Sequence, residues 1–352
     1  MDLRQLNITP DLLKLITEID EFKGAWKVTR NLSHERLQSL RHVATIESIG
    51  SSTRIEGAKL SDTQVEVLLL GIEARSFGTR DEQEVAGYAQ VMDMVFAHSD
   101  DLRLTENYIK QLHRELLRYS DKDEYHRGEY KKFPNNVEAF DGAGESLGVV
   151  FETTSPFDTP REMENLVKWT RESLEDASLH PLIVAGVFAV VFLAIHPFQD
   201  GNGRLSRVLT SLLLLRAGYS YIPYSSLESV IEKNKQAYYL SLRRTQSALK
   251  DDTQDWLPWL RFFLTALKRQ KDHLQVKLEE SLAVQFEGLP SESIAILELA
   301  QRKGRITTAE ALELTGIPRP TVRLRLAQLV ELGHLAVRGK GRGAFYTVVI
   351  DS

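Results

Sequence analysis

The chain has 352 residues, enough for two or three domains, and its 42% hydrophobic and 26% charged residues are ordinary for a globular protein. A net charge of −5 argues against a globally basic nucleic-acid binder but leaves room for a local basic module. The lack of cysteine excludes disulfides and cysteine-ligated metals. The N-terminal residues show no apolar run after a basic start, so we expect a cytoplasmic protein without a membrane partner.

Residues 1–100 are expected to form a helical N-terminal region. Helical periodicity predicts helices over Pro10–Lys23, His34–Glu56, Asp62–Ala74, Arg80–His98 and, just beyond this region, Thr105–Tyr119. Ser61 and Gln64 fit a capping box at the start of the third of these helices.

The second predicted helix ends in the sequence SSTRIEG, residues 51–57. Ser52 and Glu56 are four residues apart and share one helix face. Gly57 suits the position just after a helix C-terminus. Taken alone, Glu56 is one more exposed carboxylate, which is the usual state of a single glutamate.

Helical periodicity is lost between residues 126 and 156. NNVEAF (residues 135–140) and VVFETT (residues 149–154) are short β-rich runs separated by glycines, which predicts a hairpin. The edge of such a hairpin could bind an extended target segment by strand addition. The alternative is a surface excursion without a binding role.

The most informative stretch is His196–Arg207, HPFQDGNGRLSR, which follows the apolar run Pro181–Ile195. This run is shorter than the roughly 20 residues needed to cross a bilayer, so we expect a buried helix. Gly201 and Gly203 permit positive φ and close backbone approach, and they precede a second helical pattern. Backbone N–H groups at such a turn, backed by a helix N-terminus, hold anions.

Charged side chains around the turn point to phosphate chemistry. Arg204 and Arg207 lie in the first turn of the following helix, which is unfavourable unless an anion lies among them, and their guanidinium groups match phosphate oxygens. Asp200 supplies the kind of oxygen that holds Mg²⁺ beside substrate phosphates. His196 is then free to accept a proton. A core helix with a glycine turn and two solvated arginines would explain only the apolar run.

HPFQDGNGRLSR resembles, without a mismatch, the signature of the Fic family, His-x-Phe-x-Asp/Glu-Gly-Asn-Gly-Arg-x-x-Arg. The resemblance covers roughly residues 48–249. It implies a mainly α fold, a Fic-type helical bundle with a β-hairpin flap, with a catalytic core over residues 101–285 and the flap at about 128–156. It also implies a protein adenylyltransferase, which transfers AMP from ATP to a Ser, Thr or Tyr hydroxyl of a target protein or of itself.

The resemblance assigns roles to the signature residues. His196 would be the general base, Asp200 would bind Mg²⁺, Asn202 with the amides of Gly201 and Gly203 would steady phosphate oxygens, Arg204 would reach the β-phosphate and Arg207 the γ-phosphate, and Phe198 would be an inward-pointing anchor. Gly203 favours AMP transfer, because the phosphotransferase relatives carry lysine at that position.

Three further segments gain implied roles. SSTRIEG resembles the family's inhibitory motif, in which Glu56 would pair with Arg207 and Ser52 would help to position the helix. The segment from Gly128 to Lys131, followed by Asn135, is similar to the family's approach to its flap, whose Val137, Val150 and Phe151 would line up the target side chain. The end of the flap, ETTSP, departs from a common proline run, so the target preference does not carry over. A Tyr-Tyr helix that flanks adenine and ribose in the family matches Asn234, Tyr238 and Tyr239, although these residues also fit ordinary amphipathic positions.

Two alternative functions remain open. The same site could remove AMP from a modified protein with Glu56 aligning a water molecule, or it could serve as a nucleotide sensor in a DNA-binding regulator. Whichever function holds, we expect a homodimer.

The C-terminal residues 286–352 form a separate predicted domain, which follows a long helical pattern over Trp256–Leu278. Three helical patterns and a basic, glycine-rich hairpin look like a winged helix. Residues 291–352 carry nine Lys or Arg and six Asp or Glu, a net charge of +3, whereas the rest of the chain carries −8. Five basic residues could contact DNA phosphates: Arg319, Arg323, Arg338, Lys340 and Arg342. Winged helices also dock proteins and mediate dimerisation.

Overall fold

The structure, a computed structural model, describes residues 6–28, 34–71, 77–99, 102–140, 146–250, 255–285, 289–339 and 344–349. The chain divides into two compact units, the first comprising Met1–Lys23 and Ser39–Asp272, the second Gly24–Gln38 and His273–Ser352. The fold is mainly α with two small two-stranded sheets, which confirms the predicted fold class. The helices in these ranges lack the combination of length and hydropathy that membrane crossing requires. The three-part division at residues 100 and 285 stays a prediction.

The helices are α1 (Pro10–Val28), α2 (His34–Ile55), α3 (Asp62–Leu69), α4 (Arg80–His98), α5 (Glu106–Leu116), α6 (Thr159–Glu175), α7 (Pro181–Ile195), α8 (Asn202–Arg216), α9 (Leu227–Lys233), α10 (Lys235–Lys250), α11 (Leu257–Gln285), α12 (Ser291–Lys303), α13 (Thr308–Thr315) and α14 (Arg319–Glu331), with 3₁₀ turns η3 (Asp121–His126) and η4 (Ile222–Tyr224). The strands are β1 (Val137–Phe140), β2 (Ser146–Phe151), β3 (Leu335–Arg338) and β4 (Phe345–Val348).

The N-terminal helices follow the predicted pattern, with differences at their ends. α2 stops at Ile55 because the next backbone N–H groups turn back to Thr53 and Arg54, and Gly57 adopts a φ of +110° that favours glycine. Glu56 therefore lies just past the helix. The capping box of Ser61 and Gln64 is confirmed, with both reciprocal bonds formed.

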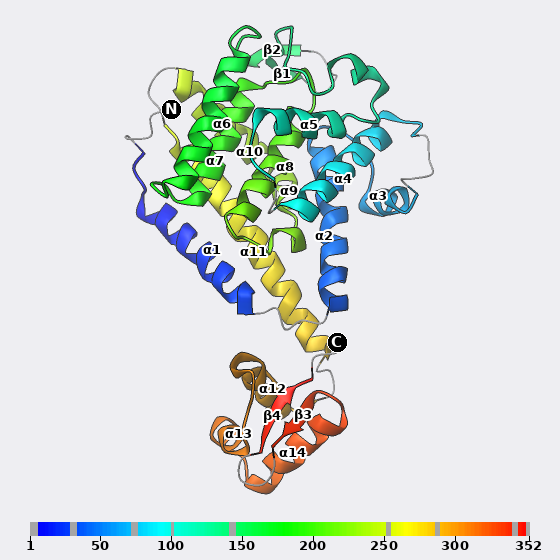
Figure 1. Cartoon of the computed structure of the whole chain (residues 1–352), viewed down its shortest axis with the longest axis vertical. Helices are drawn as coiled ribbons and strands as arrows, with labels where there is room; N and C mark the ends of the chain where they lie inside the picture. The colour runs from blue at the N-terminus through cyan, green and yellow to red at the C-terminus, as the bar shows by residue number, and fades with distance from the viewer. Residues whose placement is uncertain are drawn as a thin grey trace. The chain divides into compact units, whose positions relative to one another are not determined.

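α7 and α8 form the centre of the first unit. α7 is apolar on all sides, and nearly every one of its side chains is buried between α6, α8 and α10 (Figure 1). Each fully buried leucine, isoleucine or phenylalanine contributes roughly 1.5–3 kcal/mol. Gly186 allows close packing with α11, since an added Cβ would lie 2.9 Å from side-chain atoms of Leu260 and Phe263.

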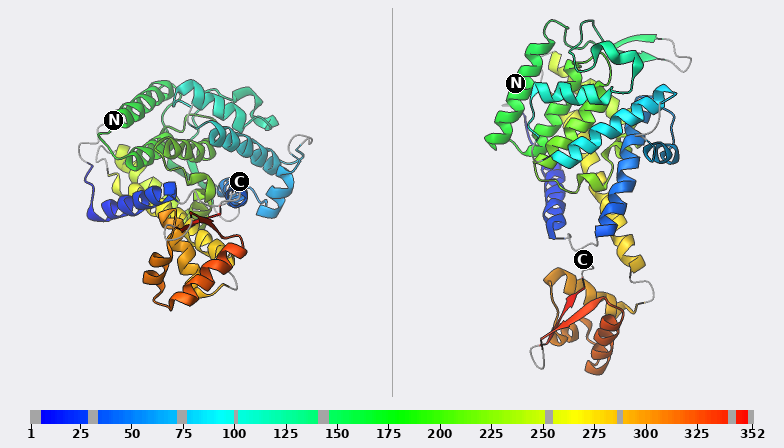
Figure 2. Two further views of the ribbon diagram at one scale, coloured as in Figure 1. Left: turned by 60° about the horizontal axis from the view of Figure 1, so that its bottom comes forward. Right: turned by 45° about the vertical axis from the view of Figure 1, so that its right-hand side comes forward.

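The predicted hairpin is confirmed as an antiparallel pair, β1 and β2, at the periphery of the helical unit (Figure 2). Its register pairs Val137 with Phe151 and Glu138 with Val149. Phe151 is buried. The side chains of Val137 and Val150 lie outside what the structure describes, so their proposed contacts with a target are not placed.

The second unit contains the predicted winged helix. Helices α12, α13 and α14 bury one apolar cluster, to which Ile296, Val322, Leu326 and Leu335 belong. β3 pairs with β4 in antiparallel fashion, and Ile306 bridges to Tyr346 to extend this small sheet. The strands and the three helices are visible together in Figures 1 and 2. Of the basic residues expected in the wing, Arg338 lies at the end of β3, whereas Lys340 and Arg342 lie outside the described residues.

Candidate active site

The turn between α7 and α8 brings the sequence motif together. α7 ends at His196, which adopts a left-handed backbone (φ 52°, ψ 59°), and Gly201 (φ +78°) caps the start of α8. The side chain of Asn202 closes the turn, because its Oδ1 accepts from the Phe198 N–H at 2.9 Å and its Nδ2 donates to the Phe198 carbonyl at 2.7 Å. These two bonds fix the orientation of the side chain, while its second Nδ2–H and the backbone N–H in the first turn of α8 are further donors.

His113 on α5 packs against this turn and hydrogen-bonds to it. Its ring stacks on Phe198 with centroids 3.8 Å apart, Nε2 donates to the Asp200 carbonyl at 3.0 Å, and Nδ1 accepts from the Gly128 N–H at 2.9 Å. These two bonds require the neutral Nε2–H tautomer. Burial lowers the pKa of His113 from 6.5 to about 3, which keeps the ring neutral.

The buried neutral His113 predicts acid destabilisation. Because its folded pKa lies below its unfolded value, its contribution to stability is fully present above pH 6.5 and is lost as the pH falls toward 3, by up to about 1.4 kcal/mol per pH unit. Urea unfolding at a series of pH values between 7 and 5 would measure this slope. A His113→Gln variant is expected to lose stability less steeply; an unchanged slope would show that this imidazole does not cause the loss.

A pocket of about 710 Å³ opens beside the turn. It is lined by residues of the turn and α8, by the hairpin and by α10: Glu56, Asn136, Phe151, Leu193, His196, Gln199, Asp200, Gly201, Asn202, Gly203, Arg204, Lys235, Tyr238, Tyr239, Leu242, Arg243 and Gln246. One end is therefore polar and rich in N–H groups, while Leu193, Leu242 and the two tyrosines make the remainder largely apolar.

Cationic groups surround the polar end. Arg204 is 2% exposed and contacts Glu84 and Asp200 at 3.4 Å each, and Arg207 is 4% exposed. Among the described residues, Nε of Arg204 and Nη1 of Arg207 are buried without a hydrogen-bond acceptor, and Nη1 of Arg204 has only the 3.4 Å ion-pair contact with Glu84. Unsatisfied buried guanidinium N–H groups are costly, and an anion bound at the turn would satisfy them.

His196 is placed to act as a base. Its Nδ1 lies 3.2 Å from the Leu193 carbonyl, which can only accept, so Nδ1 carries the proton and Nε2 keeps its lone pair. Burial, together with the charge of Lys131, lowers the pKa of His196 to about 4, although the hydrogen bond to the Leu193 carbonyl and the charges of Glu56 and Asp200 act in the opposite direction. The imidazole is therefore neutral at physiological pH.

Glu56 and Ser52 both contact Arg207. Arg207 Nη2 contacts Glu56 Oε1 at 2.8 Å and the Ser52 carbonyl at 2.9 Å, and its Nε donates to Ser52 Oγ at 2.9 Å. Glu56 also lies against Gly203: an added Cβ there would be 2.1 Å from Glu56 Oε1. A glycine at position 203 is thus needed for the carboxylate to occupy this place.

Arg54 anchors the same end of α2 to α9. Its Nε and Nη2 donate to the two carboxylate oxygens of Glu232 at 2.7 and 3.0 Å, and its Nη1 donates to Asp62 at 2.9 Å and to the Leu60 carbonyl at 3.0 Å. Glu232 lies only three residues before Lys235, where the pocket wall on α10 begins. A bidentate pair of this kind fixes both distance and orientation.

Asp200 is the carboxylate that could hold a metal. The charge of Arg204, the Gly201 amide and the charge of Arg80 lower the pKa of Asp200 despite its partial burial, so it is ionised. In the described ranges no three Asp, Glu or His side chains cluster as a metal site. A single carboxylate next to a phosphate-binding turn nevertheless fits Mg²⁺, which is usually held by one or two carboxylates plus substrate phosphates.

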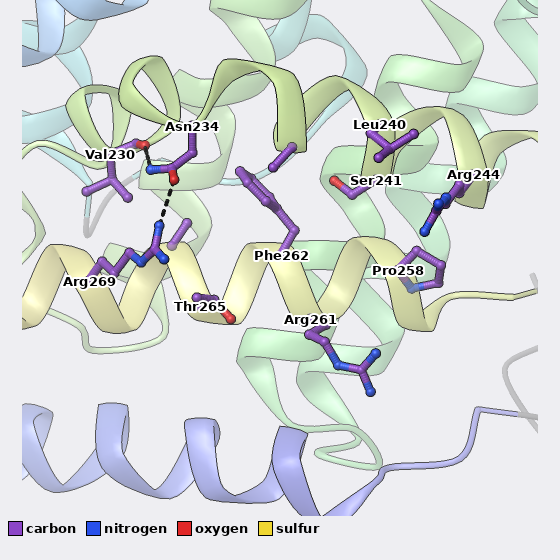
Figure 3. Close-up of a pocket in the computed structure, with 12 residues that line it drawn as sticks. Val230, Asn234, Leu240, Ser241, Arg244, Pro258, Arg261, Phe262, Thr265 and Arg269 are labelled. Atoms are coloured by element: carbon purple, nitrogen blue, oxygen red, sulfur yellow. Dashed lines mark hydrogen bonds between the residues drawn. The ribbon is translucent and has the colours of Figure 1, made fainter.

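The structure does not bring every expected residue to the pocket. Tyr238, Tyr239 and Phe151 line it. Phe198 is fully buried beneath the turn, and Asn234 lies in a different groove between α9–α10 and α11, where Arg269 donates to its Oδ1 at 2.7 Å (Figure 3). Asn234 also donates to the Val230 carbonyl, so both ends of its amide are occupied at the α9–α10 junction.

Several supporting residues were not identified from the sequence. His113, Glu84, Arg54 and Glu232 contact the site from positions remote in sequence, and no local pattern distinguishes them. Lys235 and Arg243 could have been identified from the sequence as pocket residues, because they lie one helical turn on either side of the Tyr238–Tyr239 pair on α10.

The chain thus combines a buried helix pair, joined by a glycine turn, with a winged helix. The chain contains a Fic domain: residues 103–214 match the model of the Fic/DOC family. Residues 293–333 match a model described as winged helix-turn-helix DNA-binding.

Relatives and solved structures agree with this assignment. The protein adenylyltransferase Fic of Drosophila persimilis is 28% identical over 287 residues, covering 79% of this chain and 51% of that protein, and the one of Drosophila mojavensis is 27% identical over 274 residues, covering 75% and 49%. The chain thus spans about half the length of these relatives. A Fic family protein from Desulfovibrio desulfuricans has the same fold, with a TM-score of 0.58, 24% identity and 98% of both chains covered. A C. elegans Fic-1 structure gives a TM-score of 0.58 at 19% identity, covering 77% of this chain and 72% of that one.

Proposed function

We propose that this protein is an adenylyltransferase that moves AMP from ATP to a hydroxyl group of a protein. The observation that carries the proposal is the free Nε2 of a neutral His196, placed in the same pocket as the Gly201–Gly203 turn and Arg204. The name of the Drosophila relatives, protein adenylyltransferase, supports the same reaction.

The proposed reaction is an in-line displacement. The hydroxyl oxygen of a Ser, Thr or Tyr side chain attacks the α-phosphorus, its proton passes to His196 Nε2, and the bond from the α-phosphorus to the oxygen that bridges to the β-phosphate breaks, so that pyrophosphate leaves. Backbone N–H groups of the turn and the two arginines stabilise the phosphate charge. Tyr238, Tyr239 and Leu242 give the nucleoside an apolar and aromatic wall.

Asp200 would hold Mg²⁺ in this reaction. When bound, the ion would offset the negative charge of the phosphates beside the turn. Arg80, 3.3 Å from Asp200 Oδ2, would then have to give up its contact with this carboxylate.

Glu56 makes the described state an inhibited one in this proposal. The carboxylate neutralises Arg207 and occupies the space beside Gly203, where the γ-phosphate would bind. Like charges repel at this distance, so ATP cannot seat its terminal phosphate while Glu56 stays in place.

The direct test is mass spectrometry of a cell lysate treated with ATP and a Glu56→Gly variant. Peptides that carry AMP, absent when the variant also lacks His196, would identify the target and the modified residue type. A lysate without new AMP-bearing peptides, and without self-modification, would reject AMP transfer.

Removal of AMP is the second candidate activity. The half-buried carboxylate of Glu56 lines the same pocket as His196, so it could align a water molecule for attack on an AMP-modified protein. Incubating the wild type with an AMP-modified substrate and measuring released AMP separates the two directions.

DNA binding by the second unit is favoured by the winged-helix match. Replacing Arg338, Lys340 and Arg342 together by alanine is expected to weaken DNA binding and to flatten its salt dependence, by up to about three units of log–log slope, because fewer counterions are released. Fluorescence anisotropy at several salt concentrations measures both quantities. Replacing the exposed Arg161, Lys168 and Arg171 of α6 is the control; if the intact protein fails to bind DNA at low salt, the role is excluded.

A further inference from the structure

Lys131 is a buried ammonium group that the catalytic proposal does not use. It lies between η3 and β1 and is only 3% exposed. Its Nζ donates to Asn135 Oδ1 at 2.8 Å, to Thr153 Oγ1 at 2.8 Å and to the Ile195 carbonyl at 2.9 Å. An ammonium group has three donors, and all three are satisfied by neutral acceptors.

These three acceptors belong to the two parts of the site that have to stay aligned. Asn135 precedes β1 and Thr153 follows β2, so they mark the base of the hairpin. Ile195 is the last residue of α7, and its carbonyl belongs to the peptide unit that leads into His196.

The neighbouring contacts reinforce the same junction. Asn135 Nδ2 donates to the His196 carbonyl at 3.2 Å and to the Phe198 carbonyl at 2.6 Å, and the Lys131 N–H donates to the Pro197 carbonyl at 2.8 Å. His196 has a left-handed backbone, which is uncommon for a residue other than glycine and has to be held by its surroundings. Lys131 and Asn135 bind every carbonyl from Ile195 to Phe198.

We propose that Lys131 is a positioning residue that fixes the flap hairpin and His196 in one geometry, and whose positive charge acts on the His196 imidazole. Only the expected effect of Lys131 on AMP transfer depends on the proposed adenylyltransferase function. The charges acting on the imidazole are Lys131, which favours its neutral form, and Glu56 and Asp200, which favour its protonated form. Burial lowers the pKa of Lys131 to about 8, so the ammonium form is the main one near neutral pH.

The first test is a titration of His196 in the full-length protein by NMR with isotope-labelled histidine, assigned with a His196→Gln variant. In Lys131→Met, which has a similar side-chain length and no charge, the His196 pKa is expected to rise by about one unit, because a nearby positive charge is removed. Lys132→Met, the exposed neighbour, should leave it unchanged. Equal His196 pKa values in wild type and Lys131→Met would refute the electrostatic part.

The second test separates geometry from charge by kinetics in the Glu56→Gly background. Lys131→Arg keeps the charge but replaces the three-pronged ammonium with a planar group, so the His196 pKa should stay near its wild-type value while kcat falls at least about 10-fold. The KM for ATP should change less than about 2-fold, since the phosphate turn is untouched. A wild-type kcat for Lys131→Arg would overturn the positioning role.

The two tests also distinguish this proposal from the proposed function. If the Glu56→Gly protein transfers no AMP at all, the adenylyltransferase proposal fails, yet the NMR titration still decides the role of Lys131. If Lys131→Met does not fold, as judged by thermal unfolding, Lys131→Gln replaces it in the titration and Lys131→Arg decides the geometry.

Discussion

A His196→Ala variant is expected to lose AMP transfer by at least about 100-fold, because removing a positioned general base typically costs 10²- to 10⁴-fold. The loss should be in kcat, since the Gly201–Gly203 turn, which is proposed to hold the phosphates, remains. Transfer of label from α-labelled ATP to protein, in the Glu56→Gly background, measures the rate. Calorimetric titration with ATP should show binding within a few-fold of the parent protein.

The control for this experiment is His98→Ala, an exposed histidine at the last residue of α4. It should retain the full rate. Normal labelling by His196→Ala would refute the assignment of the base, whereas a loss of thermal stability would show that the substitution acts through the fold.

A Glu56→Gly variant is expected to raise self-modification by about 10- to 100-fold. The substitution removes the charged hydrogen bond between Glu56 and Arg207, which frees the guanidinium group for the nucleotide. Hydrogen bonds to charged groups contribute about 1.5–3 kcal/mol, and this free energy sets the size of the expected effect. The rate of labelling from α-labelled ATP at saturating Mg²⁺ measures the effect.

Two further variants show whether the carboxylate or the backbone is responsible. Glu56→Gln keeps the side-chain shape without the charge and should activate in the same direction. Glu175→Gly, which removes an exposed glutamate at the last residue of α6, should leave the rate unchanged. An unchanged or lower rate in Glu56→Gly would reject inhibition by this residue.

The sequence predicted those parts of the candidate site whose residues are contiguous in the chain. The turn from His196 to Arg207 is contiguous, so its residues could be assigned to one anion-binding structure from glycine and arginine spacing alone. The apolar length of Pro181–Ile195 predicted the buried helix α7 with both of its ends. The hairpin followed from two β-rich runs and the glycines between them.

Contacts across long separations could not be predicted in this way. Glu56 and Arg207 are 151 positions apart, and only the family resemblance suggested that they meet. Asn202 was expected to steady phosphate oxygens, which stays a prediction; that its side chain also closes the turn at Phe198 could not be predicted from spacing. Asn234 has a helical position close to Tyr238, yet the turn between α9 and α10 directs it toward Arg269 and α11.

The pairing of Arg54 with Glu232 means that two independent sets of contacts hold the last turn of α2. ATP competes only for the one at Arg207, so the free energy of its binding is not spent on detaching α2 from α9. Displacement of the Glu56 side chain by a nucleotide would therefore leave α2 attached to α9 through Arg54 and Glu232.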